Sequence, residues 1–399
     1  MKLTGWFLDA YIWGDKAILW LKTEEGKTVK LVDSYTPDFY VKLRDGTVLE
    51  ETATTIGEHP QILDACIEWK YLTVTERRKT ELIHITVDSA QSFKNVLKDL
   101  GQLGNIAEWF NIDILHIQRY FFKKNFAPTQ KLKVEFDPDG TLKRVAVLED
   151  DLEIRAPPFT SVIFQIEVQS EKLSPDPEKD SITAISILND DLSVREVFRG
   201  EEKHILETFI ETIQEWDPDF LVTSKCDEAT FPYLFKRFQR KSLNPQLGRE
   251  SVDPMNAGRT NSQNFPGRVT LDLGYFCEEG IAGVVEKSRF AMVPPGLASR
   301  WAAGRIIDSR QCYEALKRDI LIPKIRSYPI YGISAKDLFF MDRGGLILSP
   351  VVGFHENIAT LDFESMFPNI LIKYNIHIPN INVYLNIGCP YFICVMASV

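Results

Sequence analysis

The sequence has few cysteines, and they form no recognisable pair. Six are scattered along the 399 residues, and no two of them stand in a C-x-x-C arrangement. This spacing is typical of a protein of the reducing cytoplasm that has neither a zinc site nor a disulfide framework. The positions are Cys66, Cys226, Cys277, Cys312, Cys389 and Cys394.

Membrane features are missing as well. No apolar run in the sequence is long enough to span a bilayer. The first residues, Met1 to Gly5, lack the apolar core of a signal peptide. We therefore expect a cytoplasmic protein with no membrane partner.

Basic residues are fewer than acidic ones. The sequence has 46 Lys and Arg against 56 Asp and Glu, which gives a net charge of −10. Proteins that bind nucleic acid are often basic, so this composition argues mildly against DNA binding. Any DNA path must be a local basic strip and not a global positive field.

The chain is long enough for two or three domains, and its first part predicts mainly β structure. Residues 6–45 alternate in the manner of strands, which predicts an antiparallel meander. Residues 90–103 predict an amphipathic helix. Residues 114–122 predict a further extended segment that ends at two lysines.

Some side chains of this first part allow two interpretations. Trp6, Trp13 and Trp20 could form a base-stacking surface, but core filling is the favoured interpretation. Lys123 and Lys124 could contact phosphate, and a solvated pair at a strand end is at least as compatible with the sequence.

Pro157-Pro158 marks a boundary, after which predicted strands and helices alternate. This alternation indicates an α/β domain. Gln165 and Glu167 lie two residues apart in its first strand, so both point to the same face. Residues 294–301 predict a turn-rich linker. The predicted strands are 161–168, 181–188, 194–198, 220–223 and 267–273, and the predicted helices are 205–216, 231–241 and 307–320.

The most informative stretch runs from Thr360 to Asn375. Ile358 to Leu361 predict a short buried strand, with Asp362 where the strand ends. Ser365 and Pro368 then suit a turn and the first turn of a helix. A buried carboxylate needs a partner, and a divalent cation is one. From spacing alone, a solvated or helix-capping Asp362 is equally compatible.

This stretch resembles a motif of the family B (alpha-like) DNA polymerases, D-x-x-S-L-Y-P-S-I-I, in the run Asp362-Phe363-Glu364-Ser365-Met366-Phe367-Pro368-Asn369-Ile370-Leu371. Gly344-Gly345-Leu346 and Gly353-Phe354-His355-Glu356-Asn357 are similar to the lead-in of that motif. The rest of the chain resembles the archaeal subgroup with degraded exonuclease motifs.

The resemblance implies a multidomain fold of the α+β or α/β class. We expect a mixed-β N-terminal domain at residues 1–155 and a ribonuclease-H-like 3′–5′ exonuclease-type domain at 156–345. The beginning of a polymerase palm is expected at 346–399.

The resemblance also implies roles for the residues of the motif. In the family, Asp362 would bind the catalytic Mg²⁺ ions, which activate the primer 3′-OH and neutralise charge on the triphosphate. Ser365, Met366 and Phe367 would contact the nucleotide, and the Phe367 ring would lie against its sugar. The expected partners are therefore primer–template DNA and deoxynucleoside triphosphates.

The exonuclease motifs depart from the family pattern. The first, D-x-E, has become Gln165-Ile166-Glu167, and an amide is a poor ligand for a hard cation. Thr230 stands at the aspartate position of the second motif, and Lys225 at its asparagine position. In the third motif, Asp308 matches the aspartate but Gly304 replaces the tyrosine.

These losses suggest that the domain keeps its fold and has lost nuclease activity. Asp227, Glu228 or Asp272 could substitute for the missing carboxylates, but each would require a changed register, which active-site geometry tolerates poorly.

After Ile376 the family's fingers, its D-T-D strand and its thumb are not found in the sequence. We therefore expect a truncated or frame-shifted end and an incomplete Mg²⁺ site. Polymerisation would then need a second polypeptide that carries the fingers, the rest of the palm and the thumb. The alternative is a catalytically inactive DNA-binding or scaffold protein. A nuclease without polymerase activity is disfavoured by Gln165 and Thr230.

Overall fold

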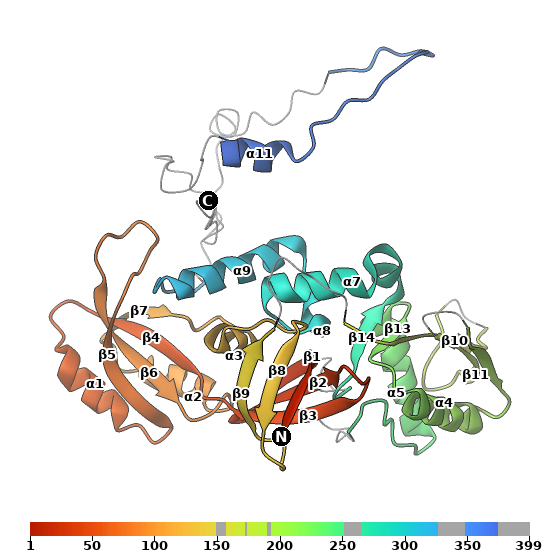
Figure 1. Ribbon diagram of the computed structural model, residues 1–399, viewed down its shortest axis with the longest axis horizontal. Helices are drawn as coiled ribbons and strands as arrows, with labels where there is room; N and C mark the ends of the chain where they lie inside the picture. The colour runs from red at the N-terminus through yellow and green to blue at the C-terminus, as the bar shows by residue number, and fades with distance from the viewer. Residues whose placement is uncertain (149–156, 172–173, 190–192, 251–264, 326–347, 374–399) are drawn as a thin grey trace.

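The computed structural model describes residues 1–148, 157–171, 174–189, 193–250, 265–325 and 348–373 (Figure 1). Its strands form three sheets, two with five strands and one with four. Figure 1 shows them along the long axis of the molecule, with the four-stranded sheet at one end. In the part of the chain that the structure describes, no helix combines the length and apolarity needed to cross a bilayer.

The central sheet is antiparallel and has the order β3-β2-β1-β8-β9. Its first three strands confirm the predicted meander. Trp6 and Trp20 are buried, as core filling predicted, whereas Trp13 is half exposed. The strands are β1 (Lys2–Trp13), β2 (Lys16–Thr23), β3 (Thr28–Ser34), β8 (Leu132–Phe136) and β9 (Leu142–Val147).

The four-stranded sheet has the order β5-β6-β4-β7 and carries helices on one face. Ile83, Ile85 and Phe39 point to that face and pack against Ile56 and Phe93. The elements are β4 (Asp38–Leu43), β5 (Ile62–Lys70), β6 (Thr80–Val87), β7 (Ile106–Phe110), α1 (Leu49–Gly57) and α2 (Phe93–Leu100).

Residues that were predicted to be extended form helix α3 (His116–Lys124) instead. Ile117, Tyr120 and Phe121 are spaced as on one face of a helix, and all three are buried in the core of the central sheet. The extended prediction was wrong because this helical period was overlooked. Lys124 does not end a strand, and its Nζ lies 2.5 Å from an oxygen of Asp33.

The third sheet has the order β12-β11-β10-β13-β14, with β13 parallel to both of its neighbours. Helices α4 and α5 share one core with it, and Trp6 and Leu8 of β1 pack into the core on its other side. The elements are β10 (Ser161–Val168), β11 (Ile182–Asn189), β12 (Arg195–Arg199), α4 (Glu202–Trp216), β13 (Phe220–Thr223), α5 (Phe231–Arg240) and β14 (Val269–Asp272).

Three helices then lead back toward the four-stranded sheet (Figure 1). They are α7 (Leu273–Ala291), α8 (Pro295–Ala298) and α9 (Ala303–Lys317). The predicted linker at 294–301 thus contains a short helix. Beyond α9, Ile320 pairs with Tyr71, and Pro323 pairs with Phe110 of β7.

The described segment 348–373 contains helix α11 (Met366–Lys373) and an irregular stretch before it. The predicted turn at Ser365 and the helix after it are confirmed. The predicted buried strand is wrong, because Ile358 is 70% exposed and Leu361 is 93% exposed. A strand needs a neighbouring strand to accept its backbone hydrogen bonds, and no described strand pairs with this stretch.

Candidate functional site

Strand β10 carries the first two residues of the predicted nuclease site. Gln165 and Glu167 are both exposed, and the residues between and around them are more buried. They pair with Ser186 and Ala184 of β11, which fixes their register. The prediction that they share one face of the sheet is therefore confirmed.

Thr230 lies where a π-helical turn (Cys226–Thr230) passes into α5. Its side chain is largely buried, and its hydroxyl donates a hydrogen bond of 2.7 Å to the backbone carbonyl of Ser224. This hydrogen bond stabilises the turn that precedes α5.

Asp308 lies on α9 and lines a cavity of about 620 Å³ together with Asp113 and Gln118. Burial raises the pKa of the Asp308 carboxyl, against the opposing effect of Arg305. Neither Gln165, Glu167 nor Thr230 lines this cavity. The structure thus places Asp308 beside residues of the N-terminal part of the chain.

Two of the three carboxylates that could replace the missing ones already have partners. Asp227 forms a bidentate ion pair with Arg300, in which Nε lies 2.6 Å from Oδ2 and Nη2 lies 2.8 Å from Oδ1. Asp272 caps helix α7 by accepting a hydrogen bond of 2.9 Å from the backbone N–H of Gly274. Glu228 is exposed and lines, with Asp227, Asp272 and Arg300, a hollow of about 340 Å³.

Arg300 is the residue of this region that sequence reasoning missed. Its guanidinium also donates to the hydroxyl and the carbonyl of Thr270, at 2.8 Å and 3.0 Å, and to the carbonyl of Gly296. One cation therefore joins β14, α8 and the π-helical turn at the ends of β13 and β14. No motif spacing signals this pairing, because Arg300 and Asp227 are 73 residues apart.

Among the described residues, the candidate carboxylates do not come close enough together for three of them to bind one metal ion. There, the only group of three or more His, Cys, Asp or Glu side chains within reach of one metal ion is Cys66, Glu68 and His84. That group lies in the four-stranded sheet, far along the chain from β10 and α9.

The predicted polymerase residues lie in segment 348–373. Asp362 is exposed, and its Oδ1 accepts a hydrogen bond of 2.9 Å from the N–H of Phe363. Ser365 adopts a left-handed backbone, with a φ of 49°, directly before Met366 begins α11. Phe367 belongs to α11, but its side chain, the lead-in at 344–346 and the tail from 374 lie outside the described residues.

Comparison with known proteins agrees with this arrangement of sheets. Residues 107–282 match the exonuclease domain of DNA polymerase family B, and residues 313–381 match DNA polymerase family B. The family B DNA polymerase of Pyrobaculum calidifontis has a similar structure, with a TM-score of 0.76 and 19% identity over 94% of this chain and 57% of the other.

Curated relatives show the same extent of similarity. A DNA polymerase of Archaeoglobus fulgidus is 24% identical over 94% of this chain and 54% of its own length. DNA polymerase 2 of Aeropyrum pernix is 23% identical over 90% of this chain and 53% of its own length. The chain thus spans about half the length of the curated relatives it matches.

The expected fold class is confirmed, a mixed α/β multidomain protein whose third sheet belongs to a ribonuclease-H-like domain. The family inferred from the Asp362 motif is also confirmed, since two family models and archaeal relatives together cover most of the sequence. The chain belongs to the family B DNA polymerases.

Proposed function

We propose that the chain is part of a DNA-directed DNA polymerase whose proofreading site no longer hydrolyses DNA. In this proposal residues 1–155 form the N-terminal domain, 156–345 the nuclease-like domain and 346–399 the beginning of the palm. The observation that carries it is the replacement of two nuclease carboxylates by Gln165 and Thr230 on an otherwise preserved fold.

Phosphodiester hydrolysis by two metal ions needs several carboxylates on one pair of ions about 4 Å apart. Of the two carboxylates of the D-x-E motif, only Glu167 remains on β10. The Thr230 hydroxyl donates its hydrogen bond to the backbone carbonyl of Ser224. Asp308 lines a cavity with Asp113, and Asp227 is held by Arg300. These contacts support loss of nuclease activity with retention of the domain as a brace or a surface for single strands.

The polymerase centre needs more than these 399 residues. Family members use divalent metal ions, and Asp362 is the residue proposed to bind Mg²⁺ here. One exposed carboxylate does not fit a pair of Mg²⁺ ions, so we derive no step through them. The second catalytic aspartate, fingers and thumb would come from further sequence or from a second polypeptide, and Ser365, Met366 and Phe367 would bind nucleotide only in that complete site.

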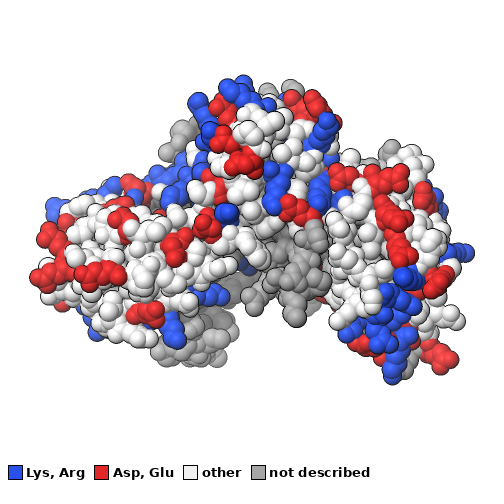
Figure 2. All heavy atoms as spheres, turned by 90° about the horizontal axis from the view of Figure 1, so that it is seen from below, with Lys and Arg blue, Asp and Glu red and all other residues white. Residues whose placement is uncertain are grey.

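DNA would bind through local basic surface, since the net charge is −10. Figure 2 shows acidic and basic side chains interspersed over one face, and on the lobe that carries the third sheet a group of basic side chains lies next to a run of acidic ones. This distribution supports a local DNA path and not attraction by the whole molecule.

The second candidate, an inactive DNA-binding or scaffold protein, is favoured by the exposure of the Asp362 segment. Primer extension separates the two. The second polypeptide of this proposal, produced from the reading frame next to that of this chain, is added to the purified chain. Asp362→Ala is the test variant, and Glu364→Ala is its control. We expect no extension by the chain alone and extension by the mixture, lost in Asp362→Ala and kept in Glu364→Ala.

Extension by the 399-residue chain alone would contradict this account of the missing parts. If the mixture fails to extend a primer while the chain still binds primer–template DNA in a fluorescence anisotropy assay, the scaffold function is the correct one.

A further inference from the structure

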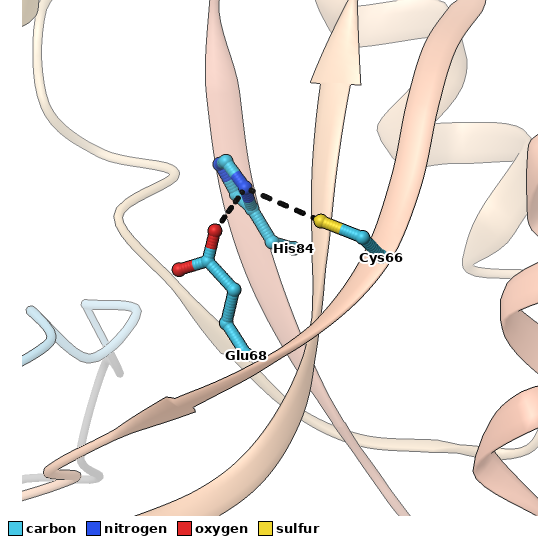
Figure 3. Close-up of side chains that lie close together, drawn as sticks. All are labelled: Cys66, Glu68 and His84. Atoms are coloured by element: carbon cyan, nitrogen blue, oxygen red, sulfur yellow. Dashed lines mark hydrogen bonds and ion pairs between the residues drawn. The ribbon is translucent and has the colours of Figure 1, made fainter.

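Three side chains of the kinds that bind transition metals meet on the four-stranded sheet (Figure 3). The Nδ1 atom of His84 lies 3.0 Å from Oε1 of Glu68 and 4.0 Å from Sγ of Cys66. The three ligand atoms all lie within 4.8 Å of one another, and all three residues are partly buried.

The sheet holds this group in place through its register. Cys66 of β5 pairs directly with His84 of β6, and Glu68 follows two residues later on the same face of β5. On the opposite face Ile83 and Ile85 are fully buried in the core beneath α1 and α2. The position of the three side chains is therefore set by a rigid element and not by a loop.

Two neighbouring side chains orient the ligand atoms. Nε2 of His84 lies 2.9 Å from Oδ2 of Asp38, so its N–H can donate to that carboxylate and leave Nδ1 facing Cys66 and Glu68. Tyr40 donates a hydrogen bond of 3.0 Å to Oε2 of Glu68, and its ring stacks on His84 at 4.5 Å. A carboxylate on the far nitrogen of a ligating His is a common feature of metal centres.

We propose that Cys66 Sγ, Glu68 Oε1 and His84 Nδ1 form a binding site for one zinc ion. A sulfur, a nitrogen and an oxygen are a ligand set that Zn²⁺ accepts, whereas Mg²⁺ and Ca²⁺ require oxygen ligands. Because the residues are only partly buried, a water molecule can occupy the fourth position.

The distances fit with small adjustments. In a tetrahedral site the Zn–S bond is about 2.3 Å and the Zn–N bond about 2.0 Å, which places sulfur and nitrogen roughly 3.5 Å apart. The observed separation of 4.0 Å is longer, so the proposal requires the Cys66 side chain to move toward His84 as the ion binds. Binding requires the Cys66 thiolate and an unprotonated Nδ1, so the thiol proton leaves to solvent as the metal enters.

A positive charge nearby limits the affinity. Nζ of Lys70 lies 3.4 Å from Oε2 of Glu68, but it also lies 2.9 Å from Oδ1 of Asp319. Asp319 therefore neutralises part of the Lys70 charge. The ion would link β5 to β6 and stabilise the N-terminal part of the chain, independently of any nuclease or polymerase activity.

Cobalt is the probe for the test, because Co²⁺ bound by a thiolate gives a charge-transfer band in the near ultraviolet. The purified, untagged chain is titrated with Co²⁺ under reducing conditions and then with Zn²⁺. We expect one equivalent of Co²⁺, a thiolate band, and displacement of Co²⁺ by Zn²⁺. The variants are Cys66→Ser and His84→Asn, with Cys277→Ser on α7 and His59→Asn as matched controls.

Cys66→Ser should lose the band, and His84→Asn should bind Co²⁺ at least about tenfold more weakly, while both controls behave as the unchanged chain. Asp38→Asn, which leaves all three ligands in place, should weaken binding about tenfold. Zn²⁺ should also raise the thermal unfolding temperature of the unchanged chain and of Cys277→Ser, but not of Cys66→Ser.

Circular dichroism of each variant verifies the fold, and Glu68→Gln serves as a second ligand variant if Cys66→Ser does not fold. The proposal is overturned if the chain binds no Co²⁺ at micromolar concentrations. It is equally overturned if the thiolate band survives in Cys66→Ser or disappears in Cys277→Ser.

Discussion

Nζ of Lys22 lies 2.8 Å from a carboxylate oxygen of Asp219, and the two side chains are 4% and 0% exposed. Lys22 belongs to β2 of the central sheet, and Asp219 directly precedes β13 of the third sheet. Asp219 also accepts hydrogen bonds from the backbone N–H of Thr160, at 3.0 Å, and from Arg249, at 2.9 Å. A buried ion pair thus connects the N-terminal and nuclease-like parts of the molecule.

Removal of the Lys22 charge should destabilise the protein. In Lys22→Met the buried Asp219 carboxylate loses its ammonium partner but keeps Arg249, and we expect the free energy of unfolding to fall by about 2 kcal/mol. Urea titration followed by tryptophan fluorescence measures this change. The control is Lys30→Met, because the side chains of the Lys30–Glu250 pair are 34% and 41% exposed and the pair should contribute less than about 1 kcal/mol. Equal losses in the two variants would contradict this assignment.

Gly267 should not tolerate a side chain. Its φ is +77°, and a Cβ atom there would lie 2.7 Å from two ring atoms of the buried Trp20. Gly267→Ala should therefore lower the free energy of unfolding by roughly 3 kcal/mol, from backbone strain together with this collision. Gly26→Ala is the matched control, since Gly26 has a φ of +82° with no atom near its Cβ position.

Gly26→Ala should lower the free energy of unfolding only by the backbone strain, which is about 1 kcal/mol. A loss in Gly267→Ala no larger than that in Gly26→Ala would show that the contact with Trp20 is not tight. Chemical denaturation of both variants under the same conditions gives the comparison.

Glu202 should make stability depend on acid pH. Burial raises its pKa, but the Arg237 guanidinium, the N–H of Ile182 and Lys241 outweigh this effect and hold the pKa at about 2. The pKa in the unfolded chain is about 4.3. The folded value is thus the lower one, so the stabilisation is fully present above about pH 5 and is lost as the pH falls toward about 2.

Urea unfolding at several pH values tests this dependence. Glu202→Gln should be less stable near neutral pH and should lose less of its remaining stability across the acid range. Glu178→Gln, at an exposed ion pair with Lys236, is the control and should leave the slope unchanged. If the free energy of unfolding depends on pH with the same slope in the unchanged chain and in Glu202→Gln, Glu202 is not the source of the acid dependence.

Much of the fold could be predicted from local patterns. Strand β10 has the predicted bounds, Ser161–Val168, and β13 also has its predicted bounds, because both are short apolar runs between clear boundaries. Strand β5 was not predicted, although Asp64, Cys66 and Glu68 alternate with apolar residues as in a half-buried strand. Helix α7 was missed because it contains Gly280, whose backbone is not helical.

The site was predictable only where one element carries it. The common face of Gln165 and Glu167 follows from strand alternation, which a sequence shows directly. The pairing of Arg300 with Asp227 joins distant parts of the chain, so no spacing rule indicates it. The same holds for Cys66 and His84, which meet through strand register and form no short motif such as a C-x-x-C pair.

The central claim is that the nuclease-like domain has lost hydrolysis with the carboxylates at positions 165 and 230. The most direct measurement is degradation of a 5′-labelled single-stranded primer by the purified chain with Mg²⁺, run beside Glu167→Ala. We predict no shortening by either protein. Mg²⁺-dependent shortening from the 3′ end that disappears in Glu167→Ala would contradict the claim.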